Sequence, residues 1–133
     1  MHSDRGKIYN HERARQQRDY SGLRFGNITP TDIDGIIEYK NIGYVIIELK
    51  YSDNVLPYGQ KLALERLTDD LEKAGKPCLC IVATHLTLNC NEDIDVASAL
   101  VEEYRYKEQW RENKNSLATK ELIERFFKRL ERQ

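Results

Sequence analysis

The sequence predicts an α/β fold in which a mixed sheet is flanked by helices. Residues 33–39 and 44–51 are two apolar segments on either side of a short turn, which is typical of a β-hairpin. A segment with helical periodicity follows from about residue 57, and a third apolar segment occupies residues 78–86. Because strand–helix–strand connections are right-handed crossovers, we expect strands 44–51 and 78–86 to be parallel.

Length and composition favour one soluble domain. The chain has 133 residues, of which 40% are hydrophobic and 32% charged, so it resembles neither a disordered chain nor a disulfide-dependent miniprotein. We expect a single domain over residues 1–133, with a core over roughly 5–110 and a C-terminal helix over roughly 117–132. An apolar stretch of about 18 residues is absent, so no membrane span is expected.

Each element has a local signal. Residues 9–20 are compatible with a helix that Gly22 and Gly26 end, and the turn Asn41-Ile42-Gly43 offers a glycine for positive φ. Asp53 or Asn54 is expected to cap the helix that begins near Pro57. Its apolar face is expected to carry Leu64, Leu67 and Leu71, and Lys73, Ala74 and Gly75 are expected to end it.

The C-terminal part predicts one further strand and one further helix. Residues 96–110 fit either structure, and Val101, Tyr104, Tyr106 and Trp110 favour a strand with a turn near residue 107. Thr119 is expected to cap the last helix, in which apolar residues recur every four positions: Leu122, Phe126 and Leu130.

The cysteines indicate a reducing compartment. Cys78 and Cys80 alternate within an apolar segment, and with Cys90 they match no zinc-ligand spacing. We therefore expect buried thiols in an intracellular, cytoplasmic protein. If a phage encodes the chain, that compartment would be the cytoplasm of the host.

Charge is unevenly distributed along the chain although the formal net charge is only −1. Residues 1–26 carry +3, residues 27–104 carry −8 and residues 105–133 carry +4. The balance excludes a generally basic nucleic-acid coat. It allows an anionic partner held by the basic ends and a cation held by the acidic middle.

Three charged residues fall in the hairpin, where charged side chains would be unfavourable in a buried strand. Asp34 precedes the first strand, and Glu48 and Lys50 share one face of the second because side chains alternate along a strand. Asp34 is expected to approach Glu48 across the hairpin. Two converging carboxylates are costly unless a cation joins them, and Mg²⁺ or Mn²⁺ prefers such oxygen ligands. A solvated hairpin face with a Glu–Lys pair is the alternative.

The pattern Pro30-Thr31-Asp32-Ile33-Asp34-Gly35 followed by Glu48-Leu49-Lys50 resembles the PD-(D/E)XK nuclease superfamily, in particular its small phage-type or resolvase-like members. The resemblance covers roughly residues 5–110. It implies a restriction-endonuclease-like αβββαβ core, here with an extra C-terminal helix.

The resemblance also implies roles for particular residues. Asp34 and Glu48 would bind Mg²⁺ or Mn²⁺ together with the backbone carbonyl of Leu49, and Lys50 would assist catalysis. Asp32 has the same strand parity and is a rival to Asp34. Many members add an acid from the first helix, for which Glu12 is the candidate.

Further residues depart from the family pattern or supplement it. Some members carry Gln-x-x-x-Tyr in the helix after the lysine, whereas this chain has Gln60 but Leu64. Gln60 remains a candidate for orienting a phosphate or a water. Arginines of the first helix are candidates for phosphate contact, since arginine binds phosphate through two hydrogen bonds: Arg13, Arg15 and Arg18.

The function implied is that of a metal-dependent nuclease that hydrolyses phosphodiester bonds, with DNA as the expected substrate, although no residue distinguishes DNA from RNA or endonuclease from exonuclease action. The alternative is a nuclease-fold binding or assembly module without catalysis. The amphipathic last helix also allows a homodimer.

Overall fold

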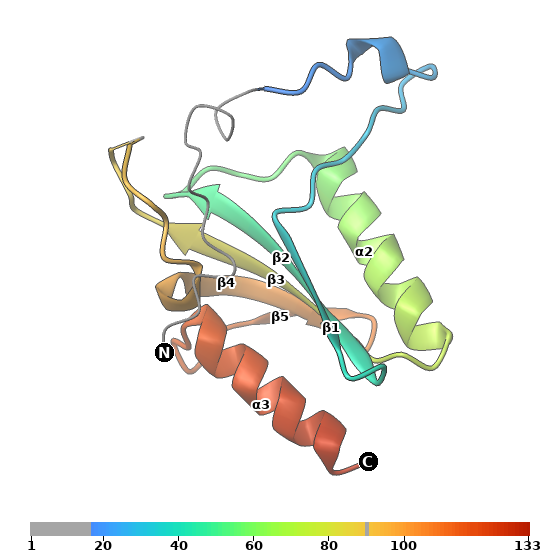
Figure 1. Ribbon diagram of the computed structural model, residues 1–133, viewed down its shortest axis with the longest axis vertical. Helices are drawn as coiled ribbons and strands as arrows, with labels where there is room; N and C mark the ends of the chain where they lie inside the picture. Colours follow the sequence, from blue (N-terminus) through green and yellow to red (C-terminus); the bar gives the residue numbers. More distant parts are fainter. Residues whose placement is uncertain (1–16, 90) are drawn as a thin grey trace, which may run out of the picture. The chain divides into compact units, whose positions relative to one another are not determined.

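The computed structural model describes residues 17–89 and 91–133 (Figure 1). The chain divides into two compact units, residues 1–30 and residues 31–133, which we describe separately. The expectation of one domain over the whole chain stays a prediction.

The described part of the first unit has little regular structure. A 3₁₀ turn spans Ser21–Leu23, and Phe25 and Ile28 form an isolated antiparallel bridge around Gly26, whose φ is +66°. Most of the helix expected over 9–20 lies outside the described residues. Its last four residues, 17–20, are not helical, so the prediction is wrong there.

The second unit is built on a five-stranded mixed sheet of spatial order β1-β2-β3-β4-β5. Only β2 and β3 are parallel, and the other neighbours are antiparallel. The α/β class, the hairpin and the parallel crossover are therefore confirmed. In the described residues two strands, and not the three of an αβββαβ core, precede the crossover helix. The strands are β1 (Gly35–Tyr39), β2 (Gly43–Tyr51), β3 (Cys78–His85), β4 (Leu100–Tyr106) and β5 (Gln109–Glu112).

The hairpin turn differs from the expectation for Gly43. Positive φ falls on Lys40 (49°) and Asn41 (60°), the central residues of the turn in which the Ile42 amide donates to the Tyr39 carbonyl, and not on Gly43. Gly43 is needed for space instead. A Cβ there would lie 2.6 Å from Leu130 Cδ1 and 3.0 Å from the Pro77 carbonyl oxygen.

Helix α2 (Tyr58–Lys73) forms the crossover, and two details of its prediction are wrong. Pro57 occupies the N-cap position, and neither Asp53 nor Asn54 caps the helix. Leu67 is 38% exposed, whereas Thr68 is buried and donates its hydroxyl proton to the Leu64 carbonyl. Its end agrees with the sequence, because Gly75 has a φ of +90°.

Residues 96–110 form a 3₁₀ turn (Val96–Ser98) and then β4, which confirms the strand interpretation. A turn with positive φ at Lys107 and Glu108 leads into β5, a strand that the sequence did not predict. Helix α3 spans Thr119–Glu131. Thr119 is its first residue and not its cap, because its hydroxyl donates to the buried Ala99 carbonyl.

The two helices lie on opposite faces of the sheet (Figure 1). On the α3 side a large apolar cluster includes Val45, Ile81, Leu122, Phe126 and Leu130. On the α2 side a smaller cluster joins Ile46, Leu64, Cys78 and Cys80. Both of these cysteines are buried free thiols, as expected, whereas Cys90 lies outside the described residues. The described helices include none with the length and apolarity that a membrane crossing requires.

Candidate active site

Asp34 and Glu48 meet at the start of the hairpin. Gly35 pairs with Ile47, so Asp34 lies one residue beyond the first pair of the ladder, opposite Glu48. The backbone amide of Leu49 donates to Asp34 Oδ2 at 2.7 Å. The Asp34 carboxylate thereby continues the pairing of the two strands and is fixed beside β2.

Glu48 is a buried carboxyl with one unsatisfied oxygen. Its side chain points toward α2, is 5% exposed, and accepts a hydrogen bond from Gln60 Nε2 to Oε1 at 2.7 Å. The other oxygen, Oε2, is buried and has no hydrogen-bond partner among the described residues. Burial, and after it the adjacent Asp34 carboxylate, raise the pKa of Glu48 to about 7, against the opposing effect of the Gln60 hydrogen bond.

Lys50 shares the face of Glu48 but turns its ammonium elsewhere. Nζ lies 2.6 Å from the Asn54 carbonyl oxygen and 2.8 Å from Glu102 Oε1. In the described part of the chain it pairs with neither Asp34 nor Glu48. The side chain is 7% exposed, so these contacts hold it firmly in place.

A recess of about 250 Å³ lies beside Lys50, between the segment that follows β2 and strand β4. Lys61 of α2 forms an ion pair with Glu103 at this recess. Sequence reasoning missed Lys61, Glu102 and Glu103. The sequence signal for Glu102 and Glu103 was a pair of adjacent acids in an otherwise apolar segment. Their positions were not predictable because residues 96–110 fitted either a helix or a strand.

The other predicted residues divide into three groups. Gln60 joins the site by donating a hydrogen bond directly to the Glu48 carboxyl. Asp32 and Asp34 are both exposed, but only Asp34 is among the groups that shift the pKa of Glu48, which favours Asp34. Glu12, Arg13 and Arg15 lie outside the described residues, and Arg18 is exposed in the first unit.

The donor groups suit a hard divalent cation. Two carboxylates face each other, and the unsatisfied Oε2 of Glu48 is an available ligand. The described residues contain no group of three or more His, Cys, Asp or Glu side chains that would hold a metal by themselves. A metal here would therefore take its remaining ligands from the Leu49 carbonyl, water or a bound phosphate.

No protein-family model and no curated protein matches the sequence, and no solved structure matches the fold. The geometry of the site is therefore the basis for the functional assignment.

Proposed function

We propose that the chain is a metal-dependent nuclease of the restriction-endonuclease-like class, acting on phosphodiester bonds with Mg²⁺ or Mn²⁺ held by Asp34 and Glu48. The observation that supports it best is the buried Glu48 carboxyl, whose Oε2 has no hydrogen-bond partner among the described residues while a second carboxylate lies beside it. Such an arrangement costs folding free energy, and a bound cation would offset that cost.

Each residue has a part in this proposal. Asp34, Glu48 and the Leu49 carbonyl would hold the cation, and Gln60 fixes one oxygen of Glu48 so that the other remains available. A bound divalent cation supplies a water of lowered pKa and neutralises charge on the phosphate. Lys50 places a buried positive charge on the same face, at the recess beside Glu102, where a phosphate oxygen would be stabilised.

The test is hydrolysis of labelled single-stranded and duplex DNA and RNA with Mg²⁺, Mn²⁺ or EDTA. We expect metal-dependent cleavage that Asp34→Asn, Glu48→Gln and Lys50→Met each reduce by about 10²-fold or more. Glu124→Gln and Lys120→Met change exposed residues of α3 and serve as matched controls. Cleavage that persists in EDTA, or in the Asp34 and Glu48 variants, would contradict the proposal.

One observation favours the alternative of a nuclease-fold binding or assembly module. The Lys50 ammonium is paired with Glu102 and the Asn54 carbonyl, and not with the proposed metal ligands. Calorimetric titration with Mn²⁺ separates the two functions. Binding that Glu48→Gln abolishes supports the nuclease, whereas no binding at millimolar Mn²⁺ supports the module.

A further inference from the structure

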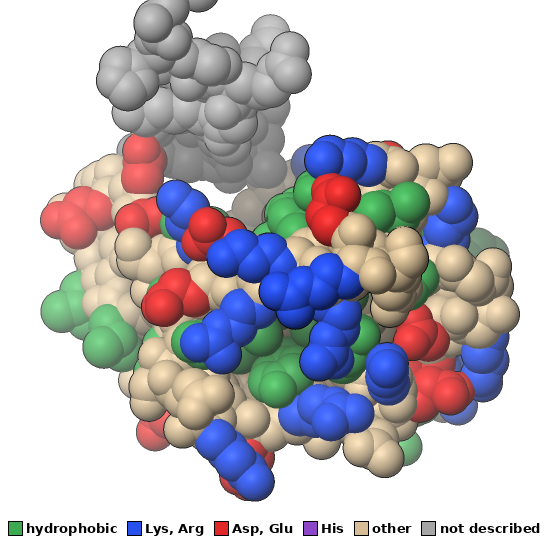
Figure 2. All heavy atoms as spheres, turned by 90° about the horizontal axis from the view of Figure 1, so that it is seen from below, with side chains coloured by type: hydrophobic (Ala, Val, Ile, Leu, Met, Phe, Trp, Pro, Cys, Tyr) green, Lys and Arg blue, Asp and Glu red, His purple; other side chains and the backbone are tan. Residues whose placement is uncertain are grey.

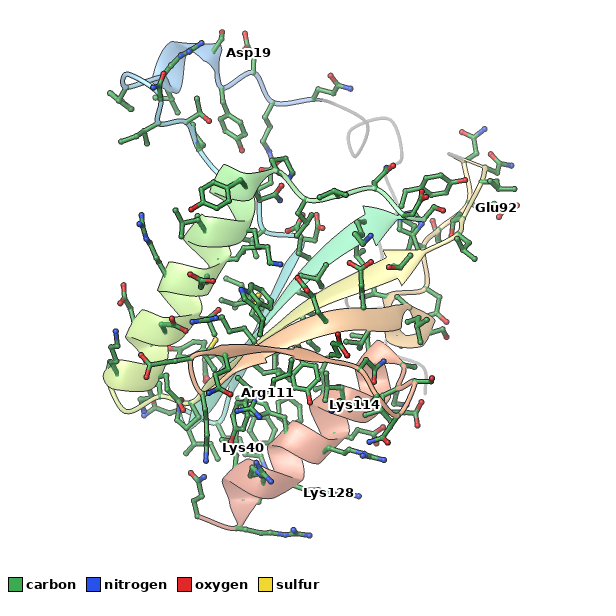
Figure 3. All side chains as sticks on the ribbon, turned by 180° about the vertical axis from the view of Figure 1, so that it is seen from behind. Asp19, Lys40, Glu92, Arg111, Lys114 and Lys128 are labelled. Atoms are coloured by element: carbon green, nitrogen blue, oxygen red, sulfur yellow. The ribbon has the colours of Figure 1, made fainter. Side chains whose placement is uncertain are left out.

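A basic cleft lies on the face of the sheet that α3 covers, opposite the face of Glu48. It has a volume of about 870 Å³ and runs between α3 on one side and β4, β5 and the segment after β5 on the other. Figure 2 shows Lys and Arg side chains gathered around an apolar patch on this face, and Figure 3 labels three of these residues. The cations that line the cleft are Arg111, Lys114, Arg125, Lys128, Arg129 and Arg132.

In the part of the chain that the structure describes, the cations of the basic cleft form no ion pair, although one acid, Glu112, also lines the cleft. Among the described residues, the ion pairs engage other basic side chains: Lys40, Lys50, Lys61, Lys73 and Arg105. None of them engages a cation of the cleft. Arg111 and Arg129 lie instead over the ring of Tyr106, at 5.8 and 5.7 Å from its centroid. With six cations and one acid in its lining, the cleft is thus a concentration of positive charge in a chain of net charge −1.

Four of these cations form one stripe along α3 and its C-cap residue Arg132, at 125, 128, 129 and 132. Spacings of three and four residues place like charges side by side, and each such pair costs about 0.2–0.5 kcal/mol in a helix. The helix dipole favours cations in the last turn. That effect does not account for Arg125, which lies earlier, or for Arg111 and Lys114, which lie outside the helix.

The floor of the basic cleft is apolar and partly aromatic. It includes Tyr104, which remains partly exposed, and Tyr106 and Phe126, which are buried. Cations at the rim and the accessible ring of Tyr104 on the floor match the two parts of a nucleotide, its phosphate and its base. Two other ligands match the cleft less well. An acidic peptide supplies negative charge but no planar bases, and a duplex keeps its bases stacked inside, away from the floor of the cleft.

We propose that the basic cleft binds single-stranded nucleic acid, with phosphates on the stripe of α3 and on Arg111 and Lys114. The proposal does not rest on hydrolysis at Asp34 and Glu48, because the sheet separates the two faces and binding needs no metal. Four of the six cations are arginines, which bind phosphate through two parallel hydrogen bonds.

The test is fluorescence anisotropy in EDTA with the full chain and a labelled oligothymidylate of about 12 nucleotides, a length within the usual span of single-strand sites. With six phosphate contacts, the slope of log K against log salt is expected to be about −4. Arg125→Gln/Arg129→Gln should weaken binding at least about 10-fold and reduce the slope by about 1.4. Lys114→Gln/Lys128→Gln, in exposed residues, provides a second pair in case the first perturbs packing on Tyr106.

The matched control is Arg66→Gln/Lys120→Gln, which removes the same charge from exposed positions outside the cleft. Unchanged binding in this control, with weaker binding in both cleft variants, supports the proposal. Equal weakening in the control would overturn it. The proposal would also be overturned if poly-glutamate, duplex DNA or anionic vesicles competed as effectively as the unlabelled strand. Equally effective competition by thymidine monophosphate would overturn it too, because that result would indicate a site for a single nucleotide.

Discussion

At the scale of single residues, the burial of Glu48 makes a pH-dependent prediction. The folded protein holds a proton on this carboxyl up to a pKa of about 7, whereas the unfolded chain releases it near the ordinary value of 4.5. The folded state therefore binds more protons between these values. Without metal, we expect the free energy of unfolding to fall as pH rises from about 5 to 8, by up to about 3 kcal/mol from this group.

Urea unfolding in EDTA across this pH range measures the effect. Glu48→Gln should remove the contribution, so the stability difference between the variant and the natural sequence should change steadily with pH. Glu124→Gln, exposed on α3, should give a constant difference. A constant difference for Glu48→Gln would show that the carboxyl is ionised in the folded protein over the whole range.

Gly43 makes a second prediction at this scale. An added Cβ would meet Leu130 Cδ1 at 2.6 Å and the Pro77 carbonyl at 3.0 Å. Gly43→Ala should therefore destabilise the fold by about 1–3 kcal/mol, although φ there is ordinary. In a double-mutant cycle, Leu130→Ala should relieve part of this cost. Additive effects would mean that the destabilisation comes from the contact with the Pro77 carbonyl and not from the contact with Leu130.

Strand alternation was enough to predict some features of the site from the sequence. It placed Glu48 and Lys50 on one face and Asp34 opposite Glu48, because these relations follow from a hairpin register. The partners of Lys50 were not predictable in this way. Asn54 belongs to an irregular segment and Glu102 to an element whose type was ambiguous, so their positions depend on tertiary packing.

At the scale of elements, the ion pair between Arg105 and Asp69 is one of three that join α2 to β4 among the described residues. Arg105 of β4 is 9% exposed, and its guanidinium donates two hydrogen bonds to Asp69, from Nε at 2.8 Å and from Nη2 at 2.7 Å. Asp69→Ala should cost about 2–4 kcal/mol, because it leaves a buried charge without its main partner. Asp70→Ala, in an exposed neighbour, should change stability by less than about 0.5 kcal/mol. Equal losses in the two variants would show that Arg105 is solvated instead.

The elements were predictable where their signals are local. Apolar runs located the first three strands, and the spacing of Leu122, Phe126 and Leu130 located α3. Leu67 is exposed, contrary to its expected place on the apolar face, because α2 packs along Leu64, Thr68 and Leu71. Strand β5 has only four residues, with Trp110 as its one strong apolar signal, and it depends on pairing with β4.

At the scale of the whole second unit, the two proposed sites lie on opposite faces of one sheet. Glu48 points toward α2 through Gln60, whereas the basic cleft lies between the other face and α3. Packed layers are about 10 Å apart, so a strand held in the cleft reaches the carboxylates only by passing around an edge of the sheet. If both proposals hold, the cleft is a tether for long strands and not part of the reaction centre.

This arrangement predicts a dependence on substrate length. A strand of about 40 nucleotides bound in the cleft presents its remainder to Asp34 and Glu48 at raised effective concentration, whereas one of about 6 nucleotides is too short to use both faces. Arg125→Gln/Arg129→Gln should therefore raise KM several-fold for the long strand and leave kcat unchanged. For the short strand kcat/KM should not change, and Arg66→Gln/Lys120→Gln should affect neither substrate. A fall in kcat for the short strand would instead place the cleft within the reaction centre.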